Sequence, residues 1–217
     1  MRLTSINIGQ ERELENGARR EKTGIYKIPT YGPVEVTRLG IKDDYICDSR
    51  HHGGPDQAIY LYGSADYDWW SGELGNELPA GIFGENLTIS SLESADFCIG
   101  DRLIMGDVIL EVSAPRIPCG TLAARMGDPQ FVKRYRQAER PGLYCRVIQP
   151  GSLQVEMPVS VQKYQQETIS ILEMFRAYYD KNKNVEGIQR HLKAPIASRS
   201  RLALEHELRK RSETQAD

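Results

Sequence analysis

The sequence predicts a mainly β fold, a closed or nearly closed β-barrel with a few short helices, followed by a small C-terminal three-helix domain. Up to about residue 163, short β-branched or alternating segments are separated by glycine and proline, as in antiparallel sheets. After residue 165, apolar residues instead recur at helical spacing. We therefore expect a barrel domain over 1–163 and a helical domain with a polar tail over 164–217.

The strands are predicted from period-two alternation and from the turn residues at their ends. The clearest is the hairpin Asp101–Val112, in which Gly106 and Asp107 form a two-residue turn between two apolar runs. A short helix is expected over Ala65–Ser71. Many short strands with few helices favour a barrel over a doubly wound sheet. The other predicted strands are Leu3–Ile8, Gly24–Ile28, Val34–Leu39, Gln57–Tyr62, Asn86–Ile89, Leu143–Ile148 and Val159–Val161.

Three amphipathic helices are predicted after the barrel. The first begins at a capping box formed by Ser170 and Glu173 and runs to about Tyr179. A second covers 185–192, and a third covers 200–211. Three helices of this size have only a small apolar core, so we expect them to pack on the barrel or on a second copy of the chain in a homodimer.

Composition excludes several classes of protein. The chain has 217 residues, a net charge of −2 and 40% hydrophobic residues, which suits a globular protein. No apolar run approaches the roughly 18 to 20 residues of a membrane span, and the chain begins with no apolar signal segment. The four cysteines form no CxxC motif. We expect a cytoplasmic protein with reduced thiols, no membrane partner and no nucleic-acid partner.

Cys119 is the strongest candidate for a reactive group. It follows Pro115 and Pro118, which stiffen the backbone, and it precedes a segment of helix-forming composition. Arg116 and the positive end of that helix would both favour the thiolate, which attacks electrophiles and binds metals. The alternative is a buried structural cysteine.

Two loops carry further functional groups. In the first, Arg50 and His52 are followed by Gly53, Gly54 and Asp56, so that proton-exchanging side chains adjoin an accessible backbone. In the second, Glu85 and Asn86 precede a strand, where they would orient a heterocycle or satisfy a turn.

Two kinds of site compete for these residues. Cys47, His51 and His52 have no common zinc spacing, which argues against structural zinc. Cys119 with His52 and with Asp56 or Asn86 would also suit a cysteine hydrolase, because the partners of such a triad meet only in space.

The loops together resemble the MOSC family, named for the C-terminal domain of molybdenum cofactor sulfurases, and within it the bacterial YiiM-type group. One departure is Asp43, which stands where relatives usually have glycine, and it affects only a local turn. The motifs that carry the resemblance, in order along almost the whole chain, are Lys22–Ile25, Leu39–Gly40, His52–Asp56 leading into Ala58–Tyr60, Phe83–Leu87, Gly100–Asp101 and Pro115–Cys119.

The resemblance implies a MOSC-like β-barrel that binds the molybdenum cofactor, with Cys119 coordinating the metal. A thiolate is a suitable ligand for a metal already held by soft sulfur. The phosphate of the pterin needs cations and backbone donors, for which Lys22 and Thr23 are candidates, helped by Arg19, Arg20 or Arg116. The pterin edge or the substrate would be met by His52, Asp56, Glu85 and Asn86.

The YiiM-type resemblance implies reductive cleavage of N–O bonds in N-hydroxylated base analogues such as hydroxylaminopurine, a detoxification. The sequence has no GxGxxG after a strand and no cysteine cluster, so electrons would come from an external donor such as a flavin reductase, and the C-terminal helices are a candidate docking surface for it. The alternatives are a cofactor carrier or a sulfur-transfer protein that uses Cys119. Pyridoxal phosphate, suggested for the wider family, would require a lysine in a Schiff-base context, and no lysine stands in one.

Overall fold

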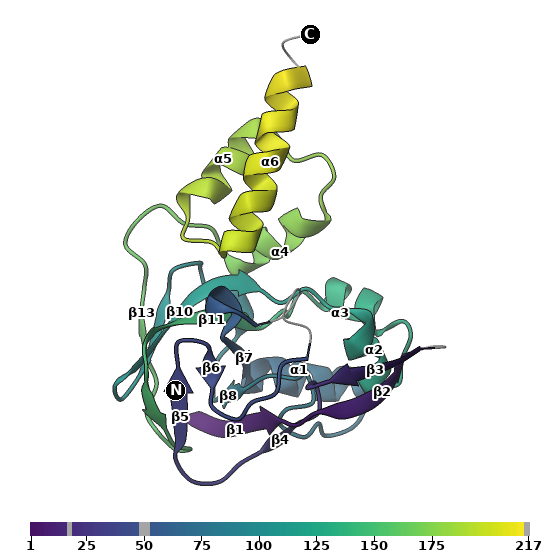
Figure 1. Cartoon of the computed structure of the whole chain (residues 1–217), viewed down its shortest axis with the longest axis vertical. Helices are drawn as coiled ribbons and strands as arrows, with labels where there is room; N and C mark the ends of the chain where they lie inside the picture. The colour runs from purple at the N-terminus through teal and green to yellow at the C-terminus, as the bar shows by residue number, and fades with distance from the viewer. Residues whose placement is uncertain (17–18, 48–52, 215–217) are drawn as a thin grey trace.

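An eight-stranded sheet forms the centre of the protein (Figure 1). The structure is a computed structural model that describes residues 1–16, 19–47 and 53–214. All pairings in this sheet are antiparallel except the parallel pair β7 and β8. The order across the sheet is β13 (Ser160–Gln162), β9 (Arg102–Met105), β10 (Val108–Pro115), β11 (Leu143–Gln149), β7 (Ile59–Gly63), β8 (Leu87–Ile89), β1 (Leu3–Gly9) and β4 (Lys27–Pro29).

The sheet curls but does not form a closed barrel. Its two edge strands, β13 and β4, are not neighbours in the strand order. An isolated bridge between Arg2 and Pro158 joins the start of β1 to the segment before β13, and the N–H of Leu3 donates to the carbonyl of Met157 at 3.0 Å. The prediction of a mainly β fold is confirmed. Of the two expected forms, closed and nearly closed, the structure has the nearly closed one, because the contact at β1 almost completes the ring while the edge strand β4 lies outside it.

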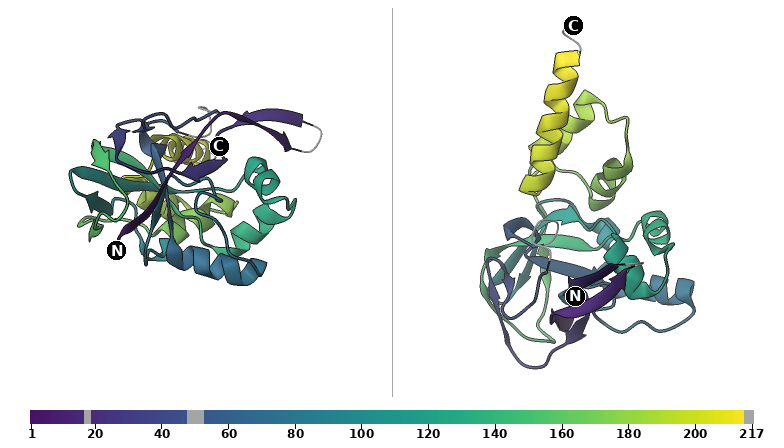
Figure 2. Two further views of the ribbon diagram at one scale, coloured as in Figure 1. Left: turned by 90° about the horizontal axis from the view of Figure 1, so that it is seen from below. Right: turned by 45° about the vertical axis from the view of Figure 1, so that its right-hand side comes forward.

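Two smaller sheets flank the large one. One contains β12 (Gly151–Leu153), β5 (Val34–Thr37) and β6 (Gly40–Ile41). The other is a hairpin of β2 (Arg12–Asn16) and β3 (Arg19–Thr23), which projects from the body of the protein (Figure 2). The sequence did not predict this hairpin, and the predicted strand Gly24–Ile28 is wrong, because the chain there leaves β3 and re-enters the large sheet as β4.

Three helices of the barrel region enclose an aromatic core. They are α1 (Ser64–Leu74), α2 (Gly120–Met126) and α3 (Phe131–Ala138). The ring of Trp70 on α1 lies 5.0 Å from that of Phe131 and 5.9 Å from that of Tyr135, both on α3, and its indole N–H donates to the hydroxyl of Tyr62. Such rings bury a large apolar area and pack in tilted or stacked pairs, which holds α1 against α3.

The C-terminal helices stack at one end of the sheet (Figures 1 and 2). They are α4 (Ile171–Tyr179), α5 (Val185–Lys193) and α6 (Ser198–Thr214), close to the predicted ranges. Half of the predicted capping box is observed: the N–H of Glu173 donates to the hydroxyl of Ser170 at 3.0 Å, so Ser170 is the N-cap of α4, while the Glu173 carboxylate contacts Arg190. Backbone bonds tie these helices to the sheet, among them that from Ala197 to Ser113. That 1–163 and 164–217 are separate domains stays a prediction.

Candidate functional site

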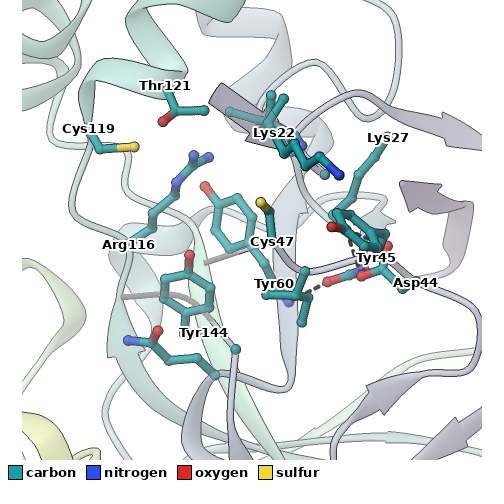
Figure 3. Close-up of a pocket in the computed structure, with 18 of the residues that line it drawn as sticks. Lys22, Lys27, Asp44, Tyr45, Cys47, Tyr60, Arg116, Cys119, Thr121 and Tyr144 are labelled. Carbon is teal, nitrogen blue, oxygen red and sulfur yellow. Dashed lines mark hydrogen bonds and ion pairs between the residues drawn. The ribbon is translucent and has the colours of Figure 1, made fainter. Parts of the chain in front are cut away.

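A large pocket opens beside the β2–β3 hairpin and encloses about 820 Å³, including open space at its mouth (Figure 3). The end of the hairpin, the segment after β6, the loop before β7 and the β10–α2 connection all contribute walls. The lining residues are Glu21, Lys22, Thr23, Gly24, Ile25, Lys27, Asp44, Tyr45, Ile46, Cys47, Gly53, Gln57, Ala58, Tyr60, Gly84, Asn86, Arg116, Cys119, Thr121 and Tyr144.

Cys119 lines this pocket and is half-buried rather than sealed in the core. It forms the N-cap of α2, with an extended backbone at φ −131° and ψ 172°. Its carbonyl accepts the N–H groups of Leu122 and Ala123 at 3.1 and 3.2 Å, so the first turn of the helix holds its position. By contrast, Cys145 is fully buried, and burial raises the pKa of its thiol well above the ordinary value.

Arg116 places a buried positive charge in the same pocket. Its residue is 4% exposed, its Nη1 donates to the carbonyl of Phe83, and its guanidinium lies 5.1 Å from the ring centre of Tyr60. Within the described part of the chain its Nε has no hydrogen-bond partner, and no carboxylate pairs with it. Burial alone would lower its pKa, but the surrounding tyrosines and Cys119 outweigh that effect and raise it.

The balance of charge at Arg116 favours an anionic occupant. A buried guanidinium without a counter-ion costs several kcal/mol of solvation, on the order of what an ion loses on leaving water. An anion in the pocket, whether a phosphate or a thiolate, offsets that cost. The Arg116 side chain and the Cys119 sulfur approach the same part of the pocket in Figure 3.

Only some of the residues predicted to bind the phosphate line the pocket. Lys22 lines it, but its ammonium pairs with Glu11 at 2.6 Å, and that contact raises the pKa of Lys22. Thr23 also lines it, while its hydroxyl accepts the N–H of Ile25. Arg19 begins β3, where its side chain lies outside the described part, and Arg20 is exposed and pairs with Glu15.

The glycine loop is divided between the pocket and another surface. Gly53 lines the pocket, whereas Gly54 is exposed and does not; both have positive φ, 73° and 79°. Gln57 lines it with a buried Oε1 that has no hydrogen-bond partner within the described ranges. The predicted site residues Arg50 and His52 lie outside the described residues.

Asp56 does not line the pocket. Its carboxylate accepts the N–H and hydroxyl of Ser198 and pairs with Nε of Arg146 at 2.9 Å. Burial acts to raise the pKa of Asp56, but the bonds from Ser198 and Arg146 prevail and lower it. The structure therefore shows the Asp56 carboxylate bound within the fold and outside the pocket, and its role in proton exchange stays a prediction.

The second loop is also divided. Glu85 is fully buried behind the pocket, where its Oε1 accepts from Tyr67, Thr88 and the N–H of Gly81, and burial raises its pKa. Its carboxylate is thus engaged within the fold, and its contact with a ligand stays a prediction. Asn86 lines the pocket, but its amide is engaged at both ends, with the N–H of Tyr60 and with Asp44.

Sequence reasoning missed an ion pair in the pocket wall, Lys27 and Asp44. Lys27 Nζ lies 2.5 and 2.6 Å from the two carboxylate oxygens of Asp44, and both side chains are almost completely buried. Asp44 follows Asp43, whose φ of 66° is the left-handed conformation that suits the glycine of relatives. The departure at Asp43 therefore leaves the turn intact. The departure at Asp43 marked this turn in the sequence, but no residue near it in the sequence indicates that the turn contacts Lys27.

Comparison with known proteins identifies the family. A family model described as MOSC domain matches residues 48–160, which include Cys119 and Arg116. The chain belongs to the MOSC domain family. It is 32% identical over 198 residues to the uncharacterized protein YflK of Bacillus subtilis, covering 91% of this chain and 90% of that protein. A crystal structure of YiiM from Geobacillus stearothermophilus matches with a TM-score of 0.79 and 29% identity, over 95% of this chain and 98% of the other.

The resemblance to the YiiM-type group is thereby confirmed, and MOSC domains are in general associated with binding of the molybdenum cofactor. A protein of Gibberella moniliformis named Reductase is 36% identical over 135 residues, which span 60% of this chain and 24% of that protein. None of the described helices is long and apolar enough to cross a lipid bilayer.

The residues of the pocket fit such a cofactor. Cys119 offers a soft sulfur ligand, and Arg116 offers an uncompensated cation whose free Nε suits an anionic oxygen. Tyr60 and Tyr144 add ring surfaces for a heterocycle. This donor set agrees with the chemistry of a phosphorylated pterin that carries a thiophilic metal.

Proposed function

We propose that this protein is a molybdenum-cofactor-dependent reductase that cleaves the N–O bond of N-hydroxylated base analogues such as hydroxylaminopurine. The observation that carries the proposal is the thiol of Cys119 in one pocket with the uncompensated guanidinium of Arg116. Membership of the MOSC family and the similarity to a protein named Reductase support the same reading.

The reaction balances as R–NHOH + 2 e⁻ + 2 H⁺ → R–NH₂ + H₂O. The bound cofactor supplies the two-electron chemistry, and an external donor such as a flavin reductase supplies the electrons. Cys119 would hold the metal, and Arg116, with Lys22 released from Glu11, would hold the phosphate. Tyr60 and Tyr144 would orient the base and exclude water from the bond that breaks.

The structure weakens the hydrolase alternative. A cysteine triad needs a base oriented by a carboxylate or an amide, but Asp56 is bound to Ser198 and Arg146, and the Asn86 amide is engaged with Asp44 and Tyr60. A carrier of the cofactor or of sulfur would use the same pocket, and only turnover separates it from a reductase.

The test is to purify the wild type and Cys119→Ala from a host that makes the cofactor, and to measure molybdenum and pterin in each. Cys145→Ser is the matched control, since that thiol is buried away from the pocket. We expect the wild type and the control to retain the metal and to reduce hydroxylaminopurine with a chemically reduced viologen. Equal metal in Cys119→Ala would refute ligation, and metal without turnover in the wild type would favour the carrier.

A further inference from the structure

Lys27 and Asp44 form a buried ion pair that faces the pocket from β4 and from the turn after β6 (Figure 3). Asp44 accepts four hydrogen bonds: Oδ1 from Lys27 and the N–H of Gly9, at 2.5 and 2.8 Å, and Oδ2 from Lys27 and the amide of Asn86, at 2.6 and 2.8 Å. Both oxygens are therefore saturated, and the carboxylate has no capacity left for a ligand.

Lys27 is not saturated. An ammonium has three N–H donors, and the two oxygens of Asp44 use two of them. In the described part of the chain no other group accepts a hydrogen bond from Nζ. Because Lys27 lines the pocket and is 8% exposed, the remaining N–H is available to a molecule inside the pocket rather than to bulk water.

Three other proton-bearing side chains of the pocket, Tyr60, Tyr45 and Arg116, are less suited to give up a proton. The Tyr60 hydroxyl is engaged with Tyr135 and the carbonyl of Pro141. The Tyr45 hydroxyl is engaged with Glu11, and that contact raises its pKa to about 12. Arg116 keeps its proton at all ordinary pH values.

The surroundings of Lys27 also favour release of a proton. Burial lowers the pKa of its ammonium, and the charge of Arg116 acts in the same direction; the charges of Asp44 and Glu85 oppose this but do not prevail. A buried lysine with a lowered pKa is a recurrent general acid or base in enzymes.

We propose that Lys27 is the catalytic residue that protonates the nitrogen of the substrate as the N–O bond breaks. This rests on the proposed function. One of the two protons of the balanced reaction passes from Lys27 Nζ to the nitrogen, which leaves as R–NH₂, and the second reaches the oxygen, which leaves as water. The two electrons come from the reduced flavin protein or viologen. Asp44 positions the amine through its two hydrogen bonds, and the amine regains its proton from solvent.

The test compares wild type, Lys27→Arg and Lys27→Met, each loaded with the cofactor, with reduced viologen and hydroxylaminopurine. Arginine keeps the charge but cannot release the proton at neutral pH, so we expect kcat to fall about 100-fold or more in both variants while molybdenum and pterin content stay unchanged. The wild-type kcat should fall as the pH rises through the pKa of Lys27, and the variants should lack that decline. Lys42→Arg, which changes a lysine outside the pocket, is the matched control and should have wild-type kinetics.

A second measurement needs no activity. In the cofactor-free protein, the side-chain ¹³C signal of Lys27, assigned by its loss in Lys27→Arg, should titrate below the ordinary pKa of lysine, whereas the pKa of Lys42 is raised by Glu35. The inference about Lys27 would be overturned if kcat of Lys27→Arg stayed within twofold of the wild type, or if the titration midpoint of Lys27 lay above that of Lys42. Either result would leave the proposed function standing. Loss of the cofactor together with turnover would also overturn the inference, because Lys27 would then be a binding group. A fully loaded wild type without turnover would instead refute the proposed function itself.

Discussion

The carboxylate of Asp56 accepts two hydrogen bonds from Ser198, one from its N–H at 2.7 Å and one from its hydroxyl at 2.6 Å. Asp56 precedes Gln57, which lines the pocket, and Ser198 begins α6. A pocket loop and the last helix are thus joined by one side chain across 142 positions of sequence.

Removing this contact should weaken the attachment of α6. We expect Asp56→Ala and Ser198→Ala each to lower the free energy of unfolding by about 1–2 kcal/mol, since each deletes hydrogen bonds to a partly buried carboxylate. The double variant should cost at least about 0.5 kcal/mol less than the sum of the two. Urea unfolding measures all three values, and strict additivity would show that the two residues do not interact.

Asp56 also predicts a pH dependence. Its pKa is lower in the folded protein than in the unfolded chain, so its contribution to stability is present above the unfolded pKa of about 3.9 and is lost as the pH falls through the folded value. Asp56→Asn should therefore flatten the decline of stability below about pH 4. Urea midpoints across acid pH check this, and an unchanged slope in the variant would contradict it.

Arg116 should make the cofactor-free protein respond to anions. Phosphate at ten times its dissociation constant should stabilise the wild type by about 1.4 kcal/mol, seen as a rise in melting temperature. Arg116→Met should lose this response, because the buried guanidinium is then absent. Arg38→Met, which changes an exposed arginine, should keep it. An equal response in all three proteins would show that phosphate binds elsewhere.

Gly24 fixes the distance between the pocket wall and the chain at Tyr45. A Cβ at Gly24 would lie 1.9 Å from the carbonyl oxygen of Tyr45, which no side-chain movement relieves. We expect Gly24→Ala to lower the free energy of unfolding by ~3 kcal/mol. At Gly72 in α1 a Cβ meets nothing within 4 Å, so Gly72→Ala should raise it by about 0.5–1 kcal/mol. Denaturant unfolding of the pair tests the contrast, and an equal effect would contradict it.

Asp43 is the one residue of its turn that should gain from becoming glycine. Because the φ of Asp43 is 66°, Asp43→Gly should raise the free energy of unfolding by about 1 kcal/mol, since glycine adopts this left-handed conformation without strain. Lys42→Gly, next to it without a positive φ, should lower stability instead. A loss of stability in Asp43→Gly would show that its side chain holds the turn.

The sequence predicted the features that depend on residues close together along the chain. The turn at Gly106 and Asp107 appears as expected because two residues specify a hairpin, and α4 begins at Ser170 because its cap lies within one turn. The position of Cys119 at the start of α2 followed from the helix-forming composition of the segment after it. The place of Cys119 in the pocket needed the fold.

The errors concern contacts between distant segments. The hydrogen bonds from Ser198 to Asp56 were missed because Ser198 lies in another part of the chain. The β2–β3 hairpin escaped detection because its strands are highly charged and only Leu14 provides a core-facing apolar residue on β2. Lys27 was predicted as part of an ordinary strand, because its ion pair with Asp44, a residue distant in sequence, could not be foreseen.

Both tryptophans of the protein, Trp69 and Trp70, are on α1, against the sheet, while α4, α5 and α6 have none. Tryptophan fluorescence therefore reports only on the sheet half, whereas far-ultraviolet circular dichroism is weighted toward the terminal helices. If the two halves unfold independently, the fluorescence and circular dichroism curves will have different midpoints in denaturant. If they unfold as one cooperative unit, the two curves will coincide.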